Sequence, residues 1–424
     1  MRNFIDKFFF RSNNLDYISQ NIKNLSNKTP ANKIFEAINS YSNESEIRYV
    51  GGCIRKIINK ENVDDVDLAT NLEPYQICEA LKKNNIQFHE TGLAHGTITA
   101  LIDEFKFEIT TLREDIATDG RHAKVRFSKN WKEDSLRRDF TINSIYSDQT
   151  GNLFDPNNGK KDLEAGNINF IGNADKRIKE DYLRILRYLR FFINYSNKPH
   201  NSEIIRKIKI NIGGVSNISK ERLLDELKKI IKLNTLEKLT KDKICLNLIL
   251  TIFPELENIS IFSKLSPLKK SLLKENDFIL FLSLMIIGKN DNTDYFLYKY
   301  NISKKDQKRI KNIDNFYKNK LQSKIFSENN LNKIFYFDGN QAVIDILVFE
   351  IIKSKKLDNN LKKLIEVYKN KTIPKMPISA EMIMKKFNIP EGKELGLKLK
   401  TIEKEWVENN FKISNQKIDN IINN

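Results

Sequence analysis

The stretch "RYVGGCIRKIINKENVDDVDLATN", Arg48 to Asn71, decides the fold. It opens with a short apolar run, turns at Gly51 and Gly52, and continues into a pattern typical of a helix start that contains Arg55. Glycines at a strand-to-helix turn let backbone N–H groups approach a phosphate, and the arginine adds positive charge. The alternative is a tight turn with a solvent-facing arginine.

The same stretch ends in three clustered carboxylates, Asp64, Asp65 and Asp67. If "VDDVDLA" is a strand, side chains alternate, so Asp65 and Asp67 share one face and Asp64 takes the other. Paired carboxylates suit Mg²⁺, which prefers oxygen ligands, and a third one often bridges two ions. Glu108, which alternates with apolar neighbours in "KFEITTLR", is the candidate for that third position. The alternative is a solvated strand end.

The pattern of apolar residues and turn residues divides the surrounding sequence into an α/β part and a helical part. From about Arg48 to Asp155, short β-rich runs such as "IRYVGG", "VDDVDLAT", "GTITALID", "FKFEITTLR" and "INSIYSD" alternate with turns and short helical stretches. The third and fourth of these runs predict a hairpin that turns near residues 103–105. Beyond about Asp162 the apolar residues follow helical spacing, and "KTIPKMPI", residues 371–378, predicts a linker into a last helical segment.

The amino-acid composition limits the kinds of binding partner and the cellular compartment that we expect for this protein. The 424 residues carry a net charge of +17, which favours a polyanionic partner such as nucleic acid, although an AT-biased genome also enriches lysine. The cysteines Cys53, Cys78 and Cys245 are scattered, which argues against a disulfide framework or a zinc site. Because the N-terminus lacks a signal-peptide core and no later run is long enough to span a membrane, we expect a reducing, cytoplasmic setting.

Two arginine-rich segments accompany the acidic cluster. In "SLRRDFTINSIY", residues 135–146, Arg138 is placed to pair with a phosphate, and Asp139 to accept a hydrogen bond from a ribose hydroxyl. The alternative is an internal Arg–Asp pair that holds a helix to the sheet.

In the second segment, "KEDYLRILRYLRFF", residues 179–192, Asp181, Arg184, Arg187 and Arg190 recur every third residue and share a broad helix face. Asp181 and Arg184 together offer an acceptor beside a donor. Cytosine and adenine present the complementary amino group and ring nitrogen, whereas uracil and guanine leave polar groups unsatisfied. A pair of this kind therefore selects C and A. A solvated, salt-bridged helix is the alternative.

In this order the motifs resemble the class II tRNA nucleotidyltransferases, the CCA-adding enzymes, which share a family with bacterial poly(A) polymerases. The resemblance rests on "GGCIR", "DVDLATN", "HGTITALID…FEITTLRED", "DGRHAKVRF", "RRDFTIN" and "EDYLRILR", and more loosely on "ISKERLLDEL" and residues 386–411. It implies a polymerase-β-type nucleotidyltransferase head at 1–160, a helical neck at 161–235, a helical body at 236–370 and a helical tail at 371–424.

The resemblance also implies an activity and a set of residue roles. The activity is Mg²⁺-dependent addition of C, C and A to the tRNA 3′ end from CTP and ATP, without a nucleic-acid template and without an obligate protein partner. The tRNA 3′-hydroxyl attacks the nucleotide's α-phosphate in line and releases pyrophosphate. The implied catalytic carboxylates are Asp65, Asp67 and Glu108, the first two of which bind the metal. The implied nucleotide-binding residues are Gly52, Arg55, Arg138, Asp139, Asp181, Arg184, Arg187 and Arg190.

The same motifs show a difference from the family pattern and allow other functions to be considered. The family usually has Asp where this chain has Lys56, directly after Arg55. The nearest rivals are a poly(A) polymerase and a partial enzyme that adds only CC or only A. The loop "DGRHAKVRF", residues 119–127, resembles the flexible element tied to the switch from C to A, which favours full CCA addition. A non-catalytic RNA-binding protein is disfavoured because all three carboxylates are present.

Overall fold

The computed structural model describes residues 17–118, 123–288, 290–319, 325–355 and 358–423. The chain forms two compact units, Met1–Glu226 and Leu227–Asn424, and each is described by itself. The first unit contains every strand in the described part of the chain, and the second is built from helices. This is the predicted class, an α/β head followed by helices.

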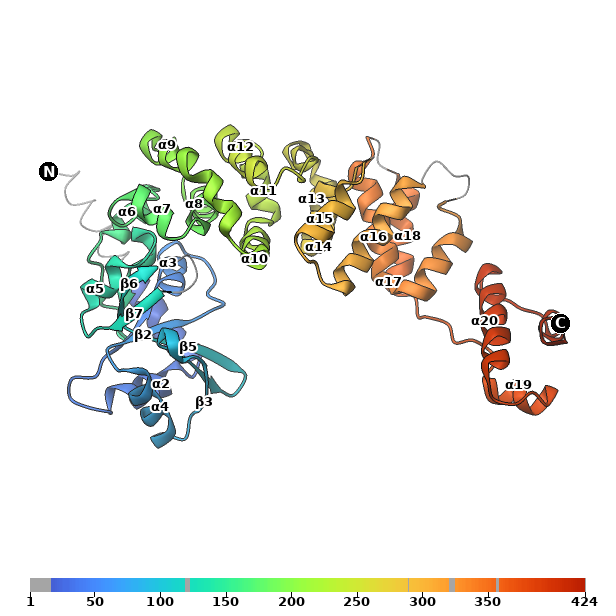
Figure 1. Ribbon diagram of the computed structural model, residues 1–424, viewed down its shortest axis with the longest axis horizontal. Coiled ribbons are helices and arrows are strands. Elements are labelled where there is room, and N and C mark those ends of the chain that lie inside the picture. The colour runs from blue at the N-terminus through green and yellow to red at the C-terminus, as the bar shows by residue number, and fades with distance from the viewer. Residues whose placement is uncertain (1–16, 119–122, 289, 320–324, 356–357, 424) are drawn as a thin grey trace. The chain divides into compact units, whose positions relative to one another are not determined.

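A seven-stranded mixed sheet forms the core of the first unit, in the order β3-β4-β5-β2-β1-β8-β9. Among the described strands only β2 and β5 pair in parallel, and they lie side by side in Figure 1. A separate two-stranded sheet joins β6 and β7. The strands are β1 (Ile47–Val50), β2 (Asp67–Thr70), β3 (Gln87–Gly92), β4 (Thr97–Ile102), β5 (Phe105–Thr111), β6 (Arg113–Thr118), β7 (Ala123–Phe127), β8 (Tyr146–Ser147) and β9 (Leu153–Phe154).

Strand alternation places the sheet's core. Along β4 the burial alternates strictly, with Ile98, Ala100 and Ile102 buried. The neighbouring strand β5 buries Phe107 and Ile109 in the same way. Between these strands Asp103 adopts φ 54°, so the predicted hairpin turns at residues 103–104. The hairpin prediction is confirmed.

Helices complete the first unit. They are α2 (Ala31–Asn39), α3 (Gly52–Ile58), α4 (Pro74–Lys83), α5 (Trp131–Leu136), α6 (Gly159–Ala165), α7 (Ala174–Glu180), α8 (Leu183–Tyr195), α9 (Ser202–Asn211) and α10 (Lys220–Ile230), whose last residues pass the division between the units. Short 3-10 turns η1 (Leu93–His95), η2 (Thr141–Asn143) and η3 (Ile212–Asn217) lie between them. The helix α8 buries an apolar face that includes Ile185, Leu186 and Leu189.

All the regular secondary structure in the described residues of the second unit is helical. Its helices are α11 (Leu233–Leu239), α12 (Lys243–Ile252), α13 (Pro267–Lys274), α14 (Phe278–Ile286), α15 (Asn292–Lys299), α16 (Lys304–Lys318), α17 (Glu328–Lys353), α18 (Asn359–Lys369), α19 (Ala380–Phe387), α20 (Lys393–Glu408) and α21 (Asn415–Asn423). The helix α17 is kinked at Gly339, which has φ 83°. The irregular stretch between α18 and α19 confirms the linker predicted at 371–378.

Four local predictions need correction or qualification. The strand β2 begins at Asp67, so the strand expected over "VDDVDLA", residues 63–69, is wrong for its first four residues. In "INSIYSD" only residues 146–147 are strand, because a 3-10 turn precedes them. The helix expected over 179–192 is broken at Asp181. In the expected flexible loop, residues 119–122 lie outside the described residues, while 123–127 form β7.

The four-domain organisation stays a prediction, since the division after Glu226 falls inside the predicted neck. Within the described residues, none of the helices has the length and apolar character needed to cross a membrane.

Candidate active site

The glycine turn brings the first two predicted site elements together. Gly51 has φ 67°, a conformation that favours glycine, and its N–H donates to the carbonyl of Ile145 at 3.1 Å. A Cβ atom added to Gly51 would lie 3.5 Å from Arg138 Nη1, and one added to Gly52 would lie 3.7 Å from Asp67 Oδ2. The turn that opens α3 therefore lies against both the proposed phosphate-binding arginine and the proposed metal ligand.

Parallel pairing of β2 with β5 sets Asp67 directly beside Glu108. The two acids come from runs 41 positions apart in the sequence, so only the sheet register brings them together. Glu108 is exposed, while its neighbours Phe107 and Ile109 are buried, which agrees with the predicted alternation. The geometry supports a carboxylate pair at one edge of the two strands.

In the described residues no cationic side chain forms an ion pair with Asp67 or Glu108. Burial raises the pKa of Asp67, and repulsion from Glu108 raises it further, against opposing attraction from Arg138. Within the described chain, the carboxylates of Asp65, Asp67 and Glu108 make no hydrogen bond or ion pair. Clustered, unpaired carboxylates are the donor set that a hard divalent cation prefers, so the residues fit a metal.

Asp65 does not share a strand face with Asp67, contrary to the prediction from strand alternation. It lies on irregular backbone before β2, and its oxygen atoms do not join those of Asp67 and Glu108 within a common 4.8 Å. Asp64, its neighbour, pairs with Lys56 Nζ at 2.6 Å. The residue that departs from the family pattern therefore neutralises the one acid of the cluster that was expected to face away.

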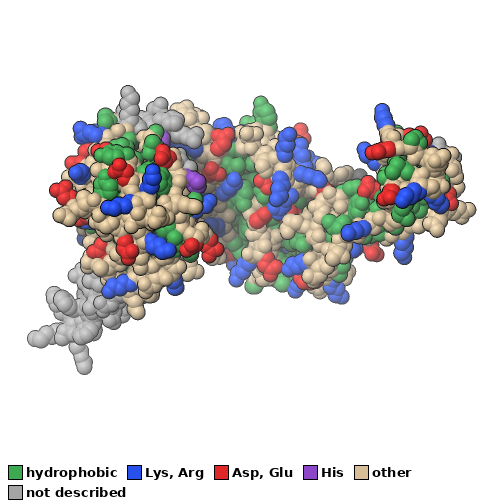
Figure 2. All heavy atoms as spheres, turned by 90° about the horizontal axis from the view of Figure 1, so that it is seen from below, with side chains coloured by type: hydrophobic (Ala, Val, Ile, Leu, Met, Phe, Trp, Pro, Cys, Tyr) green, Lys and Arg blue, Asp and Glu red, His purple; other side chains and the backbone are tan. Residues whose placement is uncertain are grey.

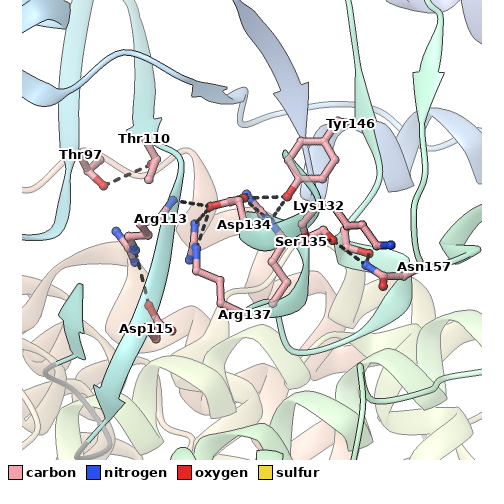
Figure 3. Close-up of polar contacts among 12 residues, drawn as sticks. Thr97, Thr110, Arg113, Asp115, Lys132, Asp134, Ser135, Arg137, Tyr146 and Asn157 are labelled. Carbon is pink, nitrogen blue, oxygen red and sulfur yellow. Dashed lines mark hydrogen bonds and ion pairs between the residues drawn. The ribbon is translucent and has the colours of Figure 1, made fainter. Parts of the chain in front are cut away.

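Asp134 is a site residue that sequence reasoning missed. Figure 3 shows its carboxylate between Arg113, Arg137 and Tyr146. It accepts hydrogen bonds from Arg137 Nε at 2.8 Å and the Tyr146 hydroxyl at 2.7 Å, and it pairs with Arg138 at 3.3 Å. It is fully buried. Asp134 therefore orients both arginines of the "RRD" motif, and its i, i+3 and i, i+4 spacing to them was the sequence signal.

Asp139 is also engaged within the protein. It accepts from Arg187 Nε at 2.6 Å, Asn143 Nδ2 at 2.8 Å and the Phe140 N–H at 2.9 Å. Burial raises the pKa of Asp139, but Arg187 and Asn143 outweigh burial and hold it well below its usual range. The contacts match the alternative of an internal pair that holds a helix to the sheet. A contact of Asp139 with ribose stays a prediction.

The break at Asp181 changes how the second arginine segment is built. Asp181 has φ −154° and ψ 104°, which is extended backbone, so it ends α7 and precedes α8 instead of lying on its face. Its Oδ1 accepts the Leu183 N–H at 3.1 Å, and its Oδ2 accepts from Arg222 Nη2 at 2.7 Å. Arg222 lies on α10 and was not predicted as a site residue.

Arg184 lies in the first turn of α8 and is 8% exposed. Its Nη1 donates to Glu180 at 2.6 Å and to the carbonyl of Arg177 at 2.6 Å. Its Nε and Nη2 donate to no atom of the described chain. Asp181 and Arg184 therefore lie close along the chain, and each keeps hydrogen-bonding capacity for a ligand, since a carboxylate accepts at up to about four positions.

The remaining predicted arginines are held by the protein. Arg190 Nε pairs with Glu226 at 2.5 Å, and that glutamate is 2% exposed. Arg55 is buried, donates to the Asn143 side chain, and lies 4.7 Å from the ring of Phe191. The Glu226 partner could have been found from "ERLLDEL", where residues 222 and 226 share one helix face.

Asp134→Asn is expected to lower the free energy of unfolding of the first unit at pH 7 by about 3 kcal/mol, because it leaves buried arginines uncompensated. Burial raises the pKa of Asp134, but Arg137 and Arg138 lower it to about 2. That value is below the ordinary one of about 3.9. The carboxylate's contribution is therefore present above about pH 4 and is lost as the pH falls toward 2.

Urea unfolding, with hydrogen exchange followed in peptides from residues 131–147, measures this effect between pH 3 and pH 7. Asp103→Asn, at the exposed hairpin turn, is the matched control. Equal midpoints for Asp134→Asn and the control at every pH would contradict the anchoring role.

Comparisons with known proteins agree with this geometry. Residues 47–169 match the model of the poly A polymerase head domain. The chain is 34% identical over 390 residues to the Homo sapiens mitochondrial CCA tRNA nucleotidyltransferase 1, covering 88% of this chain and 85% of the relative. It is 29% identical over 379 residues to the CCA-adding enzyme of Streptococcus uberis, covering 86% and 89%.

A solved structure agrees at the level of the fold. The Bacillus stearothermophilus CCA-adding enzyme in complex with CTP superposes with a TM-score of 0.67 at 18% identity, covering 92% of this chain and 95% of that one. The head-domain match alone does not distinguish CCA addition from poly(A) synthesis. The relatives that align with most of this chain, however, are named for CCA addition. The chain therefore belongs to the tRNA nucleotidyltransferase family, as a class II CCA-adding enzyme.

Proposed function

We propose that this protein adds C, C and A in sequence to the 3′ end of tRNA, using CTP and ATP without a nucleic-acid template and releasing pyrophosphate. The observation that carries the chemistry is the carboxylate pair of Asp67 and Glu108, which lacks a cationic partner and lies against the glycine turn and Arg138. Family membership supports the substrate assignment, because the long relatives are named for this activity.

Asp65 and Asp67 are proposed to hold Mg²⁺, with Glu108 as the third catalytic carboxylate. Bound there, the ion supplies neutralisation of phosphate charge and activation of the attacking hydroxyl. Asp67 is fixed by β2, whereas Asp65 lies on irregular backbone and has freedom to turn toward the ion. Arg138, already oriented by Asp134, is proposed to bind the triphosphate near the Gly52 backbone.

Around this centre the other arginines are proposed to assist. The guanidinium groups of Arg55 and Arg190 both lie over the ring of Phe191, at 4.7 and 4.2 Å from its centroid. Arg187 holds Asp139, which is proposed to bind the ribose. These contacts hold the arginine side chains beside the proposed nucleotide site. The arginines therefore supply positive charge there without forming ion pairs with the carboxylates of Asp67 and Glu108.

Asp181 and Arg184 are proposed to read the base. The carboxylate of Asp181 accepts from an exocyclic amino group, and the free guanidinium nitrogens of Arg184 donate to the adjacent ring nitrogen. Arg222 holds the first group, and Glu180 with the Arg177 carbonyl holds the second, so both are pre-positioned. Pre-positioned polar groups reject a base with the wrong edge, because a mismatch leaves them unsatisfied.

The tRNA backbone is proposed to be bound mainly through charge and shape. The chain carries a net charge of +17. On the face in Figure 2, lysine and arginine side chains are scattered among acidic ones instead of forming a single continuous patch. Dispersed phosphate contacts of this kind position an RNA helix without reading its sequence.

The assignment to the cytoplasm is a proposal as well. Disulfide bonds do not join Cys53, Cys78 and Cys245, and a reducing compartment keeps cysteines in this state. The animal relatives are named as mitochondrial. Microscopy of the natural protein fused to a fluorescent reporter separates the two compartments.

Offering each nucleotide singly to a tRNA transcript that lacks CCA tests the proposed function. CTP alone is expected to give two additions and then a stop, while UTP, GTP and ATP alone give almost none. Extension by ATP alone into a long tail would point to a poly(A) polymerase. Failure of CTP on this transcript, with addition of one A to a transcript that already ends in CC, would point to a partial enzyme.

A further inference from the structure

We propose that Arg177 is a positioning residue for base selection, which ties Arg184 to the main chain at Arg137 and Arg138. The inference rests on the proposed base-reading role of Arg184. Arg177 lies on α7 and touches neither the carboxylate pair nor, in this account, the nucleotide. It acts through the residues that it holds.

The contacts of Arg177 run in two directions. Toward the sheet, its Nη2 donates to two consecutive main-chain carbonyls, those of Arg137 and Arg138. Toward α8, its Nη1 pairs with Glu180, and its own carbonyl accepts from Arg184 Nη1 at 2.6 Å. Glu180 also accepts from Arg184 at 2.6 Å. One residue therefore bridges the "RRD" segment and the proposed base-reading arginine.

The helix break makes this bridge necessary. Because Asp181 is extended, α7 and α8 are separate helices, and no continuous helical hydrogen-bond ladder fixes the first turn of α8 relative to α7. The Arg177 carbonyl and the shared Glu180 carboxylate span that break to Arg184. Orientation of Arg184 is consequently set by side-chain contacts that a single substitution removes.

The side chain of Arg177 is buried, so its hydrogen bonds must offset the cost of removing its charge from water. Arg177 is 9% exposed, and its Nε is buried without a hydrogen-bond partner in the described chain. Burial lowers the pKa of Arg177, with nearby Arg184 adding to the effect. A guanidinium held against that cost needs strong directed contacts, and here they are two carbonyls and one carboxylate.

The bridge fixes a distance that base selection requires. Arg138 is proposed to bind the triphosphate and Asp139 the ribose, and both adjoin the carbonyls that Arg177 holds. Arg184 is proposed to contact the base at the other end. A nucleotide spans these points, so a shift of Arg184 relative to Arg138 weakens discrimination between bases more than it weakens overall binding.

A lysine cannot replace this guanidinium. Arginine presents planar donors in a fixed fork, whereas lysine is a single point charge on a flexible stem. Arg177→Lys keeps the charge but cannot reach both carbonyls and Glu180 together. We expect it to reduce the ratio of kcat/KM for CTP over UTP by about tenfold, with tRNA affinity within about twofold of wild type.

The experiment measures single-nucleotide addition by the full-length enzyme in four forms: wild type, Arg177→Lys, Arg184→Ala and the double variant. If Arg177 acts through Arg184, Arg177→Lys reduces CTP-over-UTP discrimination in the wild-type background but not further in the Arg184→Ala background. Arg206→Lys, on an exposed position of α9, is the matched control and is expected to change nothing.

Unchanged discrimination in Arg177→Lys, or an equal loss in both backgrounds, overturns the proposal. If Arg184→Ala itself leaves discrimination intact, the base-reading role fails and this inference fails with it, which separates that result from a failure of Arg177 alone. If Arg177→Lys does not fold, Glu180→Ala removes the acceptor that Arg177 and Arg184 share and is expected to produce the same loss; intact discrimination there overturns the proposal.

Discussion

Asp67→Ala is expected to abolish nucleotide addition while tRNA is still bound. Asp67 is the carboxylate fixed by both the parallel pairing with β5 and the glycine turn, so its removal dismantles the proposed metal site at its most rigid point. Metal ions contribute several kcal/mol of transition-state stabilisation in phosphoryl chemistry, which corresponds to a loss of about 10³-fold or more in rate. Gel analysis of single-turnover extension, beside filter binding of tRNA, measures both properties.

The acidic neighbour provides a matched control for this experiment. Asp64→Ala removes a carboxylate three positions away, but that group pairs with Lys56 on the exposed surface. Exposed pairs of this kind contribute little, so we expect activity close to wild type. Retained turnover in Asp67→Ala, or an equal loss in both variants, would contradict the metal assignment.

Asp181→Ala and Arg184→Ala are expected to relax base selection more than they reduce tRNA binding. Each variant removes one of the two groups proposed to match the edge shared by cytosine and adenine. A lost hydrogen bond in a site built to recognise it changes discrimination by about 1–3 kcal/mol. The preference for CTP over UTP is therefore expected to fall by about 10- to 100-fold.

Competition between labelled CTP and UTP on one tRNA transcript measures this preference directly. Arg206→Ala controls for loss of an exposed arginine in the same unit. Asp181→Ala also frees Arg222, so Arg222→Ala separates the effect of the ion pair from that of the carboxylate. Continued exclusion of U and G by both Asp181→Ala and Arg184→Ala would disprove the base-reading pair.

Much of the candidate site could be predicted from the sequence, because it is built from short local motifs. The glycine turn, the apolar alternation around Glu108 and the hairpin at residues 103–104 depend on neighbours in the chain. The helical character of the second unit also followed from periodicity. In these cases the local pattern and the fold agree.

The remaining features depend on contacts between distant segments. Strand periodicity did not reveal that β2 starts only at Asp67, and helix periodicity hid the break at Asp181, since three-residue spacing continues across it. Partners such as Asp134, Arg222 and Glu226 were missed because their importance arises from what they hold in place. Such roles are set by tertiary packing, which overrides local propensity.

The most direct test of the central claim is the length of the product when a tRNA transcript lacking CCA is incubated with CTP and ATP together. Sequencing gel resolution of single nucleotides, with Mg²⁺ present, provides the measurement. We expect addition of C, C and A, followed by a stop at three nucleotides. A continuing A tail, a stop after two nucleotides, or incorporation of U or G at comparable rates when they are supplied would contradict it.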